Sequence, residues 1–70
     1  MWKDVKTPPE EGGLYLVAVV ASEGEKLVAT ALYERENGRD FWEIQHTYVA
    51  VYNGKIKAWK ALPEFPKEFE

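Results

Sequence analysis

Leu14-Tyr15-Leu16-Val17-Ala18-Val19-Val20-Ala21 is the most strand-like stretch of this 70-residue chain. It is short, rich in β-branched residues and bounded by Gly13 and Ser22, which is typical of a β-strand. Its apolar residues do not alternate with polar ones, and this predicts a strand that is covered on both faces. The chain offers little else to cover a second face, so we expect its termini or another chain to do so.

The next segment, Lys26 to Arg35, fits two structures. Ser22 and Glu25 match a helical capping box, and Asn37-Gly38 would end a helix over about 23–36. The same residues also alternate as in a strand, with residues 22–25 forming a hairpin turn before it. Periodicity alone leaves both structures open.

Two Asn-Gly pairs in the second half of the chain predict turns. Asp40 to Ile44 is expected to be a short strand after Asn37-Gly38. Tyr48–Tyr52 and Lys55–Trp59 flank Asn53-Gly54, which suits the two positive-φ positions of a type I′ turn. This predicts a hairpin over residues 48–60 in which Val51 pairs with Ile56. The proline-containing tail after it is expected to be extended.

The composition narrows the classes of function. Twelve acidic and nine basic residues give a formal net charge of −3, which argues against a general nucleic-acid or membrane binder. The chain has no cysteine, and its one histidine, His46, cannot form a structural zinc site alone. No apolar run approaches the roughly 20 residues of a membrane helix. We expect one cytoplasmic domain spanning 1–70, without cofactor, metal or membrane partner.

Two motifs near the ends of the chain occur together. The first is Trp2-x-x-Val5-x-x-x-Pro9-Glu10-x-Gly12, and the second is Ile56-x-Ala58-Trp59-x-Ala61-Leu62-Pro63-Glu64-x-Pro66. Their order resembles the phage, prophage and bacterial family catalogued as domain of unknown function 551. The chain departs from that family at Ala58, where the family has histidine, and at Phe65, which breaks the final proline pair. The resemblance implies a small β-rich fold, favours a strand over residues 26–35 and implies a phage or mobile-element setting without a known activity.

Two groups of residues are candidate sites. One is a structural clasp in which the termini pack on each other, formed by Trp2, Pro9, Trp59, Pro63 and Pro66. The same residues would otherwise form an aromatic groove for a partner peptide. The other group is a candidate partner-binding surface on the predicted hairpin, formed by Tyr48, Tyr52, Lys55, Lys57 and Trp59. Its alternatives are a platform for single-stranded nucleic acid and a solvated strand edge protected by lysine.

No catalytic constellation is present in the sequence. His46 has only Glu43 and Thr47 as local partners, and the glutamate pairs fall in turns or at the ends of elements. We therefore predict a mainly β protein, a small curved antiparallel sheet or barrel-like meander of four to five strands with extended termini. We expect a non-enzymatic phage or mobile-element accessory protein that contacts a host protein or a second copy of itself. The alternative is a weak single-stranded nucleic-acid-binding module that uses the 48–60 hairpin.

Overall fold

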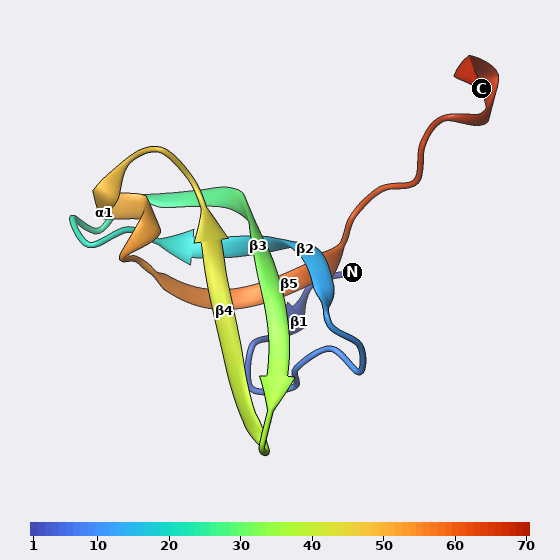
Figure 1. Ribbon diagram of the computed structural model, residues 1–70. Coiled ribbons are helices and arrows are strands. Elements are labelled where there is room, and N and C mark those ends of the chain that lie inside the picture. The colour runs from blue at the N-terminus through green and yellow to red at the C-terminus, as the bar shows by residue number, and fades with distance from the viewer.

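The computed structural model describes all 70 residues and shows one open antiparallel sheet with a single short α-helix (Figure 1). The five strands lie in the order β1-β5-β2-β3-β4. Their bounds are Lys3–Asp4 (β1), Gly13–Val20 (β2), Lys26–Glu36 (β3), Arg39–Gln45 (β4) and Lys55–Ala61 (β5). The helix α1 covers Val49–Tyr52, and a 3-10 turn, η1, covers Lys67–Phe69. The prediction of a mainly β fold with a small antiparallel sheet is confirmed.

The segment that fitted two structures is a strand, so the alternative helix at about 23–36 is wrong. β3 pairs with β2 on one side, where Leu27 lies opposite Val19, and with β4 on the other, where Tyr33 lies opposite Trp42. The predicted turn before it is present, because the Ala21 N–H donates to the Glu25 carbonyl at 2.7 Å. β3 lies between β2 and β4, and it buries alternate residues on one face.

The first Asn-Gly pair forms the tight turn between β3 and β4. Asn37 and Gly38 have φ angles of 53° and 78°, and Glu36 lies opposite Arg39 across the two-residue loop. These values match a type I′ turn, whose twist suits a right-handed twisted hairpin.

The hairpin predicted at the second Asn-Gly pair is wrong. Residues 49–52 form α1, Asn53 ends this helix with a φ of −91°, and Gly54 is not among the glycines with positive φ. The strand that follows, β5, pairs instead with β2, and Ile56 lies opposite Val19 rather than Val51. The Ser22 N–H donates to the Ala50 carbonyl at 2.9 Å, so the segment is held against the β2–β3 turn instead of against β5.

One face of the sheet carries the hydrophobic core. Val17 and Val19 of β2, Ala31 of β3 and Trp59 of β5 are buried there, and α1 adds the buried side chain of Val51. We call this the inner face. The opposite, outer face has no helix over it, and the chain after β5 leaves the sheet as an extended arm (Figure 1).

Candidate interaction surfaces

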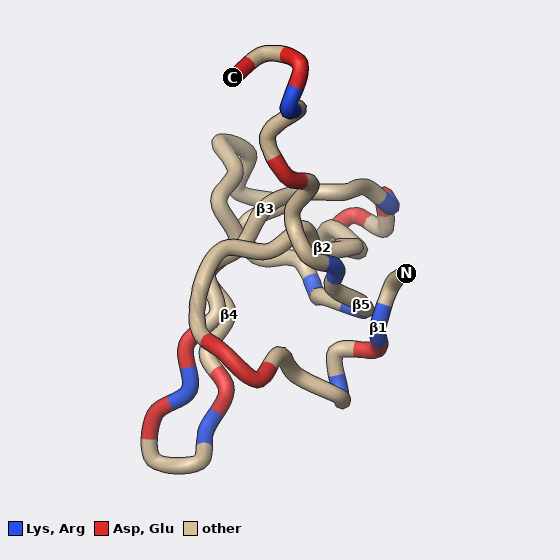
Figure 2. The backbone as a smooth tube through the Cα atoms, turned by 90° about the vertical axis from the view of Figure 1, so that its right-hand side faces the viewer, with Lys and Arg blue, Asp and Glu red and all other residues tan.

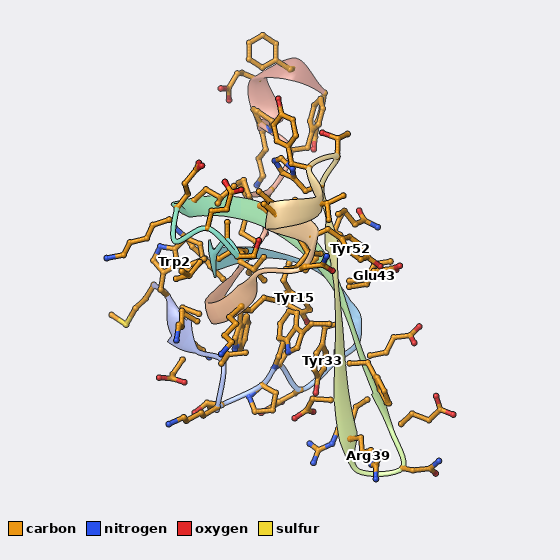
Figure 3. The ribbon with its side chains drawn as sticks, turned by 90° about the vertical axis from the view of Figure 1, so that its left-hand side faces the viewer. Trp2, Tyr15, Tyr33, Arg39, Glu43 and Tyr52 are labelled. Atoms are coloured by element: carbon orange, nitrogen blue, oxygen red, sulfur yellow. The ribbon has the colours of Figure 1, made fainter.

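Four aromatic side chains lie together on the inner face of the sheet. The ring centroids of Tyr15 and Trp59 are 5.2 Å apart, and those of Tyr33 and Trp42 are 4.7 Å apart. Figure 3 shows Tyr15 and Tyr33 directed into this common space. The Trp59 indole N–H donates to the Thr7 carbonyl at 2.8 Å, which fastens the N-terminal loop to the sheet. Trp59 is only 8% exposed, so it is a core residue and presents no ring face to a partner.

Of the predicted clasp, only the N-terminal loop that carries Pro9 is held by Trp59. Pro9 is buried on the loop that Trp59 holds, whereas Pro63 and Pro66 are exposed on the arm that leaves the molecule. Trp2 does not join Trp59, because it lies on the outer face, where the Lys60 Nζ is 5.9 Å from its ring centroid. The C-terminal prolines follow the end of β5, and an extended chain continues in the direction of its strand instead of turning back.

A polar contact fixes the end of the β3–β4 hairpin. The Tyr33 hydroxyl donates to Asp40 Oδ1 at 2.5 Å, and Arg35 Nε lies 3.8 Å from the same oxygen. The hydrogen bond to Asp40, with burial, raises the pKa of Tyr33 above its ordinary value. The contact links Tyr33 of β3 to Asp40 of β4 near the turn of the hairpin.

His46 has a local structural contact. The Tyr48 N–H donates to His46 Nδ1 at 3.2 Å, and the two rings are 5.5 Å apart. No cluster of three or more His, Cys, Asp or Glu side chains is placed to hold a metal ion. None of the helices combines the length and the apolar character that crossing a membrane requires.

Three of the five predicted partner-binding residues meet at a groove. Tyr52, Lys55 and Lys57 line a cavity of 720 Å³ between the start of β5 and the free side of β4. We call it the edge groove. Trp59 is not among its lining residues, and Tyr48, which is 70% exposed, lines a different depression beside α1. Figure 2 shows β4 on one side of the molecule and β1 with β5 on the other.

The other wall of the edge groove comes from β4, which the sequence had not indicated as a site. Four consecutive residues, Phe41 to Ile44, line it, so the groove follows the strand edge as well as one face. In an antiparallel hairpin closed by a type I′ turn, alternate residues direct their backbone groups away from the partner strand. From the Glu36–Arg39 pair onward, this leaves the backbone groups of Asp40, Trp42 and Ile44 on the open side of β4.

The outer face is a second apolar surface. Leu14, Leu16, Ala18 and Val20 occupy all the outward positions of β2. On β3, Leu32 lies opposite Leu14 and Val28 lies opposite Ala18, while Thr30 and Lys26 lie opposite Leu16 and Val20. Leu32 also lines the edge groove. Val28 is 56% exposed, while Leu14 and Leu32 are close to 40% exposed. On this face β2 is not fully covered as predicted, because Leu14 is exposed and Leu16, Ala18 and Val20 are half-buried. An antiparallel strand with one solvated face ordinarily carries polar residues there, so the missing alternation in the sequence marked an uncovered apolar face.

Comparisons with protein-family models, curated proteins and solved structures give no match to this chain. The resemblance of the two end motifs to domain of unknown function 551 stays a prediction.

Proposed function

We propose that this domain is a non-enzymatic protein-binding module whose main contact surface is the outer face. The observation that carries the proposal is the complete absence of polar residues at the outward positions of β2, next to the exposed Val28 and Leu32 of β3. An apolar surface of this kind, on a sheet with one solvated face, is typical of an interaction site.

The surroundings of the outer face fit the same proposal. Trp2, which is 40% exposed, lies toward the β1 edge beside the charged head of Lys60. Exposed aromatic residues with a polar border are characteristic of protein interfaces, which need about 1,000 Å² of total buried area to be specific. The resemblance of the end motifs supports a phage or mobile-element setting for such an accessory protein, with a host protein as the partner.

The test is photo-crosslinking in cells from position 28, with a matched crosslinker at Asn37 on the hairpin tip. We expect a discrete protein adduct from position 28 and none from position 37. Leu32→Lys should remove this adduct, whereas Leu32→Ile should retain it, because only the first places a charge on the face. Adducts with nucleic acid, or protein adducts that Leu32→Lys leaves unchanged, would contradict the proposal.

A purified sample supplies the control for folding. Leu32 is 39% exposed, and substitutions at such positions usually change stability by about 0.5 kcal/mol or less. Leu32→Lys should therefore keep the melting transition of the parent protein.

A further inference from the structure

The arm after β5, Leu62–Glu70, is exposed throughout and carries apolar side chains that nothing in the chain covers. Leu62, Phe65 and Phe69 are 37%, 65% and 73% exposed. Figure 1 shows the arm leading away from the sheet. Its only backbone hydrogen bonds are local ones within the final turn, from Phe69 to Pro66 and from Glu70 to Lys67. A segment with this composition and no backbone hydrogen bond to the sheet is suited to binding another surface.

The arm has the chemistry of a polyproline II ligand. Pro63 and Pro66 are separated by two residues, and Pro66 has φ −62° and ψ 125°, close to the polyproline II conformation. Proteins recognise this spacing with grooves lined by aromatic side chains. Prolines also remove N–H donors, so such a segment presents mainly carbonyl acceptors and requires donors on its receptor.

The edge groove offers both features. Phe41, Trp42 and Tyr52 provide aromatic side chains. Neither the Tyr52 hydroxyl nor the Trp42 indole N–H makes a hydrogen bond within the chain. The wall from β5 adds the exposed cations Lys55 and Lys57.

Charge complements this fit. The arm contains three glutamates, Glu64, Glu68 and Glu70, against one lysine, Lys67, so its side chains carry a net charge of −2. Lys55 and Lys57 on one wall of the groove are opposite in charge to these carboxylates, and Glu34 and Glu43 on the other wall are opposite in charge to Lys67. Complementary charges of this kind set the orientation of a bound segment more than its affinity.

The geometry favours the groove of a second copy over the groove of the same copy. The arm begins after Ala61, whereas the groove lies at Gly54–Lys57, the opposite end of β5. These ends are about 20 Å apart at the rise of a β-strand. Leu62 precedes a proline and is restricted to extended conformations, which opposes an immediate reversal of the chain. We propose that the arm of one copy binds in the edge groove of a second copy.

The experiment combines sedimentation with mixing of two full-length variants. Phe65→Ser disables the arm, and the double change Lys55→Glu with Lys57→Glu disables the groove. Each variant should sediment as a monomer at concentrations where the parent chain dimerises. The dissociation constant of each variant's dimer should be at least tenfold higher than that of the parent dimer. Mixing the two should restore a heterodimer, because the intact arm of one variant can bind the intact groove of the other. Lys26→Glu, which reverses a charge outside the groove, should leave dimerisation unchanged.

Four results would overturn the inference. The first is a parent chain that stays monomeric at millimolar concentration. The second is mixed variants that remain monomers, or a dimer that neither change weakens. The third is a dimer that Phe65→Ser and the groove change both leave intact while Val28→Lys dissociates it, which would assign self-association to the outer face. A monomer in which Phe65→Ser shifts the NMR signals of Tyr52 would show binding within one copy and would also contradict it.

Discussion

Asn37-Gly38 and Asn53-Gly54 share a sequence but differ in backbone conformation and in what their glycines contact. At the first pair both residues have positive φ, and a Cβ added to Gly38 would have no atom within 4 Å. At the second pair Asn53 has a φ of −91° and ends α1. A Cβ added to Gly54 would lie 2.7 Å from both Val19 Cγ1 and the Val20 carbonyl oxygen.

The same dipeptide thus meets two unrelated requirements. Gly38 is needed because of its own dihedral angles, a local property of the turn. Gly54 is needed because β5 starts against β2, so the space for a side chain is already filled by residues more than thirty positions earlier. The comparison shows that a turn signal specifies a turn only when the flanking segments can pair with each other.

The largest effect is expected at Gly54. Gly54→Val would force a branched side chain against the β2 backbone and should destabilise the domain by about 3 kcal/mol, at the upper end of ordinary overpacking. Urea denaturation of the purified variant measures this cost. A loss below about 1 kcal/mol would mean that β5 can move away from Val20 and that the close approach is not a requirement.

At Gly38 the stability cost of a substitution should depend on the chirality of the new residue and not on its size. Gly38→Ala should cost about 1–2 kcal/mol, since an L-residue is disfavoured at positive φ. D-alanine at the same position, introduced by chemical synthesis, should remove that cost, because its mirror-image preference matches the turn. At Gly54, where φ is not positive, D-alanine should give no such rescue. Equal penalties for the two alanine enantiomers at position 38 would refute the assignment.

Alanine substitution of the asparagine should also cost more stability at the first pair than at the second, and both costs should be smaller than those at the glycines. Asn37→Ala should cost about 0.5–1 kcal/mol, because asparagine tolerates positive φ better than alanine does. Asn53→Ala should stay within about 0.5 kcal/mol, since its φ is ordinary for any residue. Thermal unfolding of the two single variants side by side is sufficient. The reverse ranking would place the strained turn at the second pair.

The smallest effect concerns pH and the hairpin that Asn37-Gly38 closes. Because the bond to Asp40 raises the Tyr33 pKa in the folded protein, this group contributes stability that is fully present below the pKa of an unfolded tyrosine, about 10. The contribution is lost as pH rises through the higher folded value. Tyr33→Phe should therefore show a shallower loss of stability above pH ~10 than the parent chain. Parallel alkaline unfolding curves for the two proteins would contradict this.

Much of the fold follows from local patterns in the sequence. The β-branched run in β2 and the Asn37-Gly38 turn express dihedral preferences of neighbouring residues, whereas the periodicity of the β3 segment fitted a helix as well as a strand. The candidate site was only partly predictable. Tyr52, Lys55 and Lys57 meet at the edge groove as a group, but Trp59 and Tyr48 do not belong there, and the β4 wall carried no local signal.

Other features of the fold depend on contacts between distant parts of the chain, and only the tertiary structure decided them. Residues 49–52 are as β-branched as a strand, yet they form α1, because β5 pairs with β2 and leaves them no partner strand. Trp59 packs in the core, and its indole N–H finds its acceptor in the Thr7 carbonyl, 52 positions away. The sequence by itself identified β2 as wholly apolar. Which of its faces stays uncovered was set by the side on which α1, the N-terminal loop and the aromatic cluster pack, since burial is a property of the assembled sheet.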